Sequence, residues 1–177
     1  MKKDLFATPF WVFENVKVPC TEHFLKRCAV VKPKPSNNFN IFDYGDEGCA
    51  IRETEKLLLQ HAKECLPDHN IDISRGWVNT QLPGQALLPH SHGNELVCCL
   101  YLDVPENSGD LMLIDPRGGV NWIVEYEGNY SGFKGYRYTP KNYDLVFFPG
   151  YLVHYVTENQ SNKVRHSLAV NFNINSV

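Results

Sequence analysis

Three histidines in the second half of the chain have the types and spacing of a metal site. His90 and His92 stand two residues apart in an extended segment, so their side chains point to the same side. His154 follows the Pro149-Gly150 turn in another β-like segment. Three imidazoles on one side of an octahedral ion leave up to three positions open, which suits Fe(II) better than a closed structural zinc site. We therefore predict that His90, His92 and His154 bind a metal.

Each histidine also has a simpler explanation. A pair at i, i+2 arises by coincidence in many proteins, and the apolar neighbours of His154 would by themselves indicate a hydrogen-bonded core histidine. The combination of the three is more specific than its parts. The remaining histidines have no comparable spacing and are interpreted as structural or surface residues: His23, His61, His69 and His166.

The last predicted strand, 164–174, carries a polar face beside an apolar one. Its polar face holds Arg165, Ser167, Ala169, Asn171 and Asn173, and its apolar face holds His166, Leu168, Val170, Phe172 and Ile174. An arginine at the start of such a face suits a carboxylate ligand, with Ser167 as a neighbouring donor. The alternative is a surface strand whose polar face is solvated.

Three other residues are weaker candidates. Asn79 shares a predicted strand face with Trp77, and Tyr101 shares one with Cys99, so both could contact a bound cofactor. Each is equally well explained as a hydrogen-bonded core residue. Arg117 stands in an Asp-Pro-Arg-Gly-Gly turn, where it could contact substrate at the mouth of a barrel. A surface arginine in a turn explains it at least as well.

The elements that must position these residues are mainly β. Residues 5–18 predict an N-terminal strand, Thr21 begins a short helix, and helical spacing of apolar residues predicts a helix over 45–66 that Pro67 ends. Turn signals then separate short β-like segments at 76–82, 86–90, 96–102, 109–114, 120–125, 136–139, 145–148, 153–157 and 164–174.

This order of elements predicts a mainly β (α+β) fold, a double-stranded β-helix or jelly roll with N-terminal helices packed on one sheet. We expect a single domain over 1–177, with a supporting strand and helices in 1–72 and the jelly-roll core with the metal site in 73–177.

Composition excludes several other classes. A net charge of -3 gives no basic footprint, which argues against nucleic-acid binding through a broad patch. The six cysteines show no CxxC spacing and predict reduced thiols. No apolar run reaches the ~18 residues that span a membrane, and polar residues interrupt the N-terminus before a signal peptide could form. We therefore expect a soluble, cytoplasmic protein.

The chain resembles the Fe(II)- and 2-oxoglutarate-dependent oxygenases, and is most similar to a group of oxygenases known mainly from phage and bacterial genomes. The resemblance rests on Trp77-Val-Asn79, Gly84, His90-Ser-His92, Leu100-Tyr101-Leu102, Ser108-Gly109-Asp110-Leu111, Asp115-Pro-Arg117, Phe147-Phe148-Pro149, His154 and Arg165-His-Ser167 with Asn171. It covers most of the chain and is strongest in the second half. A phage-encoded protein that acts in a host cell would fit this resemblance.

The resemblance implies Fe(II) and 2-oxoglutarate as cofactors. His90 and His154 would bind the iron, and Arg165 would pair with the distal carboxylate of 2-oxoglutarate, helped by Ser167. The family at large has a carboxylate where this chain has His92. No catalytic residue is expected beyond the metal ligands. The implied activity is a dioxygenase that hydroxylates a substrate and releases succinate and CO2.

Two alternatives stay open at this point. A cupin has the same barrel and would use His90, His92, Glu95 and His154 as ligands for a reaction without 2-oxoglutarate, or simply bind a small molecule. An inactive jelly roll could serve as a binding module. The expected partners of the oxygenase are O2 and a small molecule or a protein side chain. Exposed edge strands leave a homodimer open.

Overall fold

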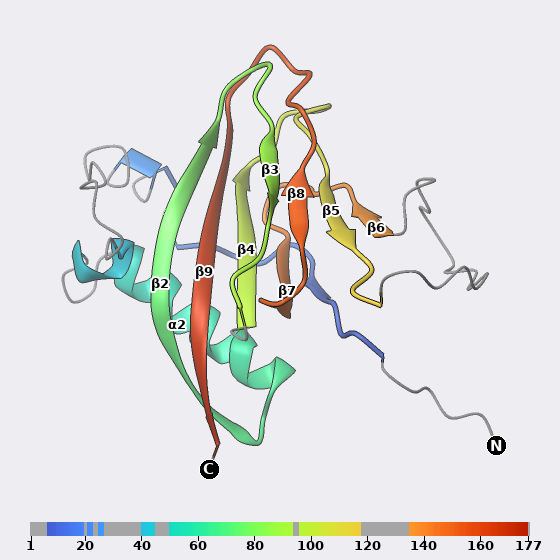
Figure 1. The fold of residues 1–177 in the computed structure, drawn as a ribbon. Helices are drawn as coiled ribbons and strands as arrows, with labels where there is room; N and C mark the ends of the chain where they lie inside the picture. Colours follow the sequence, from blue (N-terminus) through green and yellow to red (C-terminus); the bar gives the residue numbers. More distant parts are fainter. Residues whose placement is uncertain are drawn as a thin grey trace.

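Two antiparallel sheets form the molecule, with one well-described helix against the larger sheet (Figure 1). The structure is a computed structural model. It describes residues 7–19, 21–22, 25–26, 40–44, 50–93, 96–117 and 135–176. Within these ranges the chain is mostly β, as the sequence predicts.

The larger sheet has five strands in the order β1-β7-β4-β9-β2, and the smaller has four in the order β3-β8-β5-β6. Consecutive strands therefore often lie in different sheets, as a jelly roll requires. The strands are β1 (Trp11–Phe13), β2 (His69–Gln81), β3 (Leu87–His90), β4 (Leu96–Asp103), β5 (Leu111–Ile114), β6 (Gly135–Tyr138), β7 (Leu145–Pro149), β8 (His154–Val156) and β9 (Arg165–Ser176).

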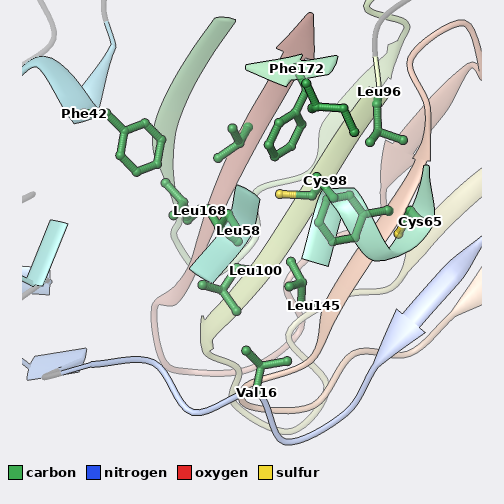
Figure 2. Close-up of a cluster of buried hydrophobic side chains, with 14 of the residues drawn as sticks. Val16, Phe42, Leu58, Cys65, Leu96, Cys98, Leu100, Leu145, Leu168 and Phe172 are labelled. Atoms are coloured by element: carbon green, nitrogen blue, oxygen red, sulfur yellow. The ribbon is translucent and has the colours of Figure 1, made fainter. Parts of the chain in front are cut away.

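Helix α2 (Ala50–Cys65) covers one face of the five-stranded sheet. Its buried residues recur at helical spacing and form one mainly apolar side of the helix: Ile51, Thr54, Leu58, Ala62 and Cys65. Figure 2 shows this outer core, in which Leu58 and Cys65 meet Cys98, Leu168 and Phe172 from β4 and β9.

A second core fills the space between the two sheets. The larger sheet contributes Val97, Tyr101, Val146 and Phe148, and the smaller contributes Leu111 and Leu113. β4 and β7 are buried on both faces because they have the helix on one side and the second sheet on the other. Their nearly continuous apolar sequences follow from this position.

Strand β2 starts earlier than predicted, at His69 instead of residue 76. A β-bulge explains the difference. Ile73 is the partner of Phe172 and Arg75 is the partner of Asn171, so Ser74 is an extra residue between them. The bulge reverses the alternation of faces, and the two halves of the strand therefore do not form one continuous sequence pattern.

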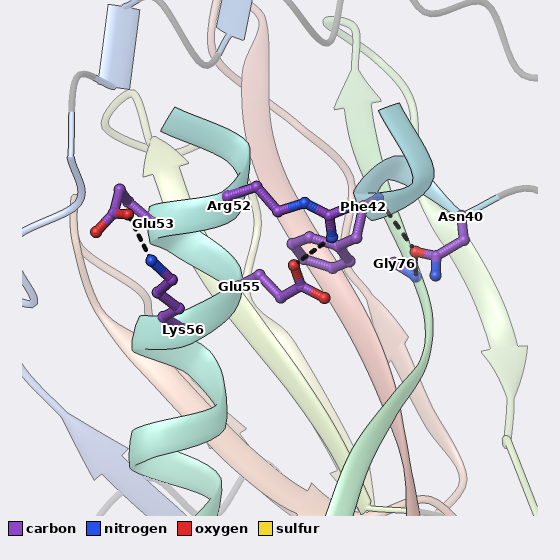
Figure 3. Close-up of polar contacts among 7 residues, drawn as sticks. All are labelled: Asn40, Phe42, Arg52, Glu53, Glu55, Lys56 and Gly76. Carbon is purple, nitrogen blue, oxygen red and sulfur yellow. Dashed lines mark hydrogen bonds and ion pairs between the residues drawn. The ribbon is translucent and has the colours of Figure 1, made fainter. Parts of the chain in front are cut away.

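Asn40 fixes β2 immediately after this bulge (Figure 3). Gly76 N–H donates to Asn40 Oδ1 at 3.0 Å, and Phe42 N–H donates to the same oxygen at 3.3 Å. Phe42 belongs to the short 3-10 helix η1 (Ile41–Tyr44) and packs where a side chain at Gly76 would stand. The contact satisfies a backbone donor at the sheet edge and holds the strand in place.

The other predicted elements are confirmed in part. The helix predicted over 45–66 is present from Ala50, and residues 45–49 lie outside the described ranges. The N-terminal strand is only Trp11–Phe13. Most of the helix predicted to begin at Thr21, and the strand predicted over 120–125, lie outside the described residues. Among the described helices, none has the length and apolar character needed to cross a membrane.

Candidate metal centre

Strand pairing in the smaller sheet brings His90 and His154 together. His90 ends β3, His154 begins β8, and the two residues are direct cross-strand partners. Partners in an antiparallel pair project to the same face of the sheet. His92 lies two residues beyond the end of β3, where its backbone N–H donates to Gly150 O at 2.7 Å. The Pro149-Gly150 turn therefore fixes the third histidine.

The three imidazoles converge as the sequence predicts. Their ring centroids are 4.4 Å apart for His90 and His154, 5.1 Å for His90 and His92, and 5.2 Å for His92 and His154. One nitrogen from each ring lies within 4.8 Å of the other two. Metal–imidazole bonds of about 2.1 Å place neighbouring ligand nitrogens roughly 3 Å apart, so small ring rotations would complete a site.

Hydrogen bonds orient two of the three rings. His90 Nδ1 lies 2.8 Å from Leu88 O, and His154 Nδ1 lies 2.8 Å from Leu152 O. A carbonyl oxygen can only accept, so both Nδ1 atoms carry the proton and both Nε2 atoms present a lone pair. This arrangement is common in metal-binding histidines.

The surroundings of His92 and His154 favour the neutral form of these two rings. The pKa of His154 falls to about 4, mainly because the ring is buried; the hydrogen bond to Leu152 O opposes this shift, and the neighbouring His90 and His92 add to it. Burial also lowers the pKa of His92, with smaller contributions from His90 and Arg75. Neutral imidazole is the metal-binding form, so the donor set suits Fe(II) at neutral pH.

Arg165 is buried on the same inner side of the large sheet. It is 2% exposed, and its Nη1 donates to Gly109 O at 2.9 Å and to Ser108 O at 3.3 Å. Its guanidinium lies 5.1 Å from the centre of the Tyr101 ring. Within the described part of the chain no carboxylate forms an ion pair with Arg165. A buried cation without an anionic partner indicates a site for an anion.

Two hydroxyl groups near Arg165 support this interpretation. Tyr101 Oη and Ser108 Oγ are buried and make no hydrogen bond. Tyr101 stacks with Arg165, and the Ser108 carbonyl accepts from it. Buried hydroxyls are normally satisfied, so these two remain available to donate to an anion beside the guanidinium.

Sheet register also brings Asn79, Ser167 and Tyr101 into one row. Ser167 of β9 is the direct partner of Asn79 on β2 and of Tyr101 on β4. Asn79 Oδ1 accepts from Trp77 Nε1 at 3.1 Å. The predicted cofactor residues therefore come from three adjacent strands of the large sheet.

Sequence reasoning gave no role to three other residues at this face. The Trp77 ring lies 5.8 Å from the His92 ring, and the Arg75 guanidinium lies 5.3 Å from the centre of the Trp77 ring. Cys99 lies beside Arg165, Ser167 and Tyr101, and burial raises the pKa of its thiol. Only the bulge at Ser74 explains why Arg75 is on this face.

Arg117 is held within its own turn. Its Nε and Nη2 donate to Asp115 at 2.9 and 2.6 Å, and its backbone N–H also donates to Asp115 at 3.0 Å. These contacts favour the interpretation of Arg117 as a turn residue. A role in substrate binding stays an untested prediction.

The cupin alternative has less support. Among the described residues, His90, His92 and His154 are the only group of metal-binding side chains close enough to hold an ion. Glu95 lies outside the described ranges.

Comparison with known proteins gives the class. A family model described as "Putative 2OG-Fe(II) oxygenase", in which 2OG is 2-oxoglutarate, matches residues 75–171, more than half of the chain. The chain belongs to this family. It is a 2-oxoglutarate-dependent oxygenase with Fe(II) and 2-oxoglutarate as cofactors, as the resemblance in the sequence implies. No curated protein sequence matches it significantly.

Solved structures show the same fold at low sequence identity. A 2OG-Fe(II) oxygenase family oxidoreductase from Burkholderia pseudomallei is similar with a TM-score of 0.66 and 11% identity, covering 92% of this chain and 83% of its own. HygX from Streptomyces hygroscopicus, with nickel, 2-oxoglutarate and hygromycin B bound, is similar with a TM-score of 0.67 and 13% identity. The match covers 93% of this chain and 82% of HygX. The α-ketoglutarate-dependent epimerase SnoN is similar with a TM-score of 0.66 and 14% identity, and the match covers 94% of this chain and 78% of SnoN.

Proposed function

We propose that His90, His92 and His154 hold Fe(II), and that the enzyme hydroxylates a small molecule with release of succinate and CO2. Arg165 binds the distal carboxylate of 2-oxoglutarate, with Ser167, Tyr101 and Asn79 beside it. The observation that carries this proposal is the buried guanidinium of Arg165, which has no carboxylate partner among the described residues. It lies on the strand whose Asn171 contacts His92.

Electrostatics explain why the ligand beside Arg165 carries a carboxylate. A buried guanidinium costs several kcal/mol unless an anion compensates it, and backbone carbonyls supply only part of that compensation. The carboxylate of a ligand would also accept hydrogen bonds from Tyr101 Oη and Ser108 Oγ, which have no other partner. The second carboxylate of the same molecule would then be directed towards the three imidazoles.

The protein residues hold and shield the reactants. Bound Fe(II) supplies the site at which 2-oxoglutarate and O2 react. His90 and His154 keep their rings fixed through the Leu88 and Leu152 carbonyls. The inner core, with Phe148 packed 4.9 Å from the His154 ring centre, excludes water from one side of the site.

We propose that the substrate is a small molecule. The HygX structure contains bound hygromycin B, and this supports an organic small molecule as the substrate of the present enzyme. Protein side chains are the alternative substrate. We further propose that residues 1–177 act as one domain, in which 1–72 support the barrel of 73–177; β2 crosses this division.

The first experiment measures cofactor binding directly. Protein purified without oxygen is loaded with Fe(II) and titrated with 2-oxoglutarate, and the visible charge-transfer band of the Fe(II)–keto acid chelate is recorded. We expect the wild-type protein to show the band. Arg165→Gln should bind Fe(II) normally and 2-oxoglutarate about 10- to 100-fold more weakly, as expected for the loss of a charge-assisted bidentate contact.

Two further variants control the experiment. Arg165→Lys keeps the charge but not the forked geometry and should give an intermediate affinity. Arg52→Gln removes an arginine that pairs with Glu55 on α2, on the other side of the large sheet, and should leave the titration unchanged. Iron bound without a band would favour a cupin-type site, and a protein that binds no metal would favour a binding module.

A further inference from the structure

The third histidine differs from the other two in its hydrogen-bond partner. His90 and His154 each direct Nδ1 at a backbone carbonyl two residues earlier in the chain. His92 Nδ1 instead lies 3.3 Å from the side-chain amide of Asn171 on β9. His92 is therefore the one member of the group whose orientation depends on a side chain of the opposite sheet.

The amide of Asn171 has an unsatisfied oxygen. Asn171 is 8% exposed, its Nδ2 is the atom facing His92 Nδ1, and its Oδ1 is buried without a hydrogen-bond partner. A half-turn about the Cβ–Cγ bond exchanges two groups of nearly equal size. The oxygen then faces His92 Nδ1, and the buried acceptor gains the partner that it lacks.

The two orientations have opposite consequences for the metal. If Nδ2 donates to Nδ1, the proton of neutral His92 resides on Nε2, and that nitrogen has no lone pair for a metal. If Oδ1 accepts from Nδ1–H, Nε2 presents a lone pair, as it does in His90 and His154. Only the second orientation makes the three rings equivalent donors.

We propose that Asn171 is a positioning residue that accepts a hydrogen bond from His92 Nδ1–H and thereby makes His92 Nε2 the third ligand of the iron. This inference rests on the proposed function of the three histidines. It also explains how β9 serves both cofactors, because Arg165 and Asn171 lie on the same face of this strand.

Substitution of Asn171 tests the direction of the hydrogen bond. Asn171→Leu keeps the branching and the number of side-chain heavy atoms but has no acceptor, and should weaken Fe(II) binding about 10- to 100-fold, the usual effect of losing such a partner. Asn171→Asp accepts but does not donate at neutral pH. It should bind Fe(II) at least as tightly as wild type, because its charge makes His92 a stronger donor.

The absorption band provides a second readout. In the Fe(II)- and 2-oxoglutarate-loaded Asn171→Asp protein, a more electron-rich iron should move the charge-transfer band to longer wavelength. Nitrogen-15 NMR of histidine in the Zn(II)-loaded wild-type protein should show His92 protonated at Nδ1. Fe(II) affinity is measured by chelator competition without oxygen, and thermal unfolding of each metal-free variant confirms folding.

Asn173→Leu is the matched control. This residue lies two positions further on the same strand, is exposed, and donates to Asp72 Oδ2 at 2.7 Å. It should leave Fe(II) affinity unchanged. The inference is wrong if Asn171→Leu binds Fe(II) like wild type, or if Asn171→Asp loses iron as Asn171→Leu does, since Nδ2 would then be the group that matters. A wild-type protein that binds no Fe(II) would instead contradict the proposed function itself.

Discussion

Individual residues of the site show how burial prepares a metal centre. His154 is 5% exposed, so the charged form of its ring is disfavoured and its pKa falls to about 4. The same burial that would destabilise an imidazolium leaves the lone pair of Nε2 available to a metal. Arg165 illustrates the opposite case, because a guanidinium cannot lose its proton and must find an anion.

The lowered pKa of His154 predicts how the stability of the metal-free protein depends on pH. Above pH 6.5 the ring is neutral in both the folded and the unfolded chain. As pH falls from 6.5 to about 4, the unfolded chain binds a proton that the folded protein does not, so folding loses roughly 3 kcal/mol of stability from this group. Denaturant unfolding of the chelator-treated protein at a series of pH values measures this loss.

His154→Gln should remove that part of the pH dependence, because glutamine does not titrate. His69→Gln changes an exposed histidine on β2 and should retain the wild-type dependence. If the free energy of unfolding changed equally with pH in wild type and His154→Gln between pH 4 and 6.5, His154 would not be the source of this pH dependence.

At the scale of elements, β2 shows how one extra residue changes what a strand presents. Before the bulge at Ser74, Ile71 and Ile73 pack against the core beneath the helix. After it, Arg75 and Trp77 lie beside His92. The position of the strand depends on Asn40 and on the close approach of Phe42 to Gly76, where a side chain has no room.

Gly76→Ala tests this close approach. The added methyl group would overlap the Phe42 ring and approach Ile41, so we expect the free energy of unfolding to fall by about 1–3 kcal/mol. Phe42→Leu shortens the opposing side chain and should recover part of the loss in the double variant. Urea unfolding of the two single variants and the double variant measures the coupling, and strictly additive effects would contradict the contact.

At the scale of the molecule, the candidate metal centre lies between the two sheets. His90 and His154 belong to the smaller sheet, while His92 contacts Asn171 on the larger one. An ion bound by all three rings would therefore join the two sheets of the barrel at one point. The two cores meet the same strands, β4 and β7, from opposite sides.

Metal binding should therefore stabilise the whole fold. A ligand that binds only the folded state contributes about 2.7 kcal/mol when its concentration is 100 times its Kd. We expect Fe(II), added without oxygen, to raise the Tm and a chelator to reverse the change. His154→Ala should abolish the shift, and His69→Ala should preserve it. A metal-induced shift that persists in His154→Ala would place the ion elsewhere.

The sequence by itself determined the features that depend on local spacing. Alternation along the last strand separates Arg165, Ser167 and Asn171 from Leu168 and Phe172, and the structure confirms that separation. The mainly β architecture follows from short apolar segments between turn residues. The histidine group could be predicted because His90 and His92 stand two residues apart in an extended segment and His154 follows a turn in another β-like segment.

Only the tertiary structure decided the features that depend on pairing. The direct partnership of His90 with His154 and the hydrogen bond from His92 to Gly150 are set by register between distant strands. The bulge that places Arg75 on the inner face, and the contact of Asn171 with His92, leave no periodic signal because they join single atoms of separate elements. The sequence pattern predicts which face of a strand a residue occupies. Which residue it contacts there depends on how the two sheets pack together.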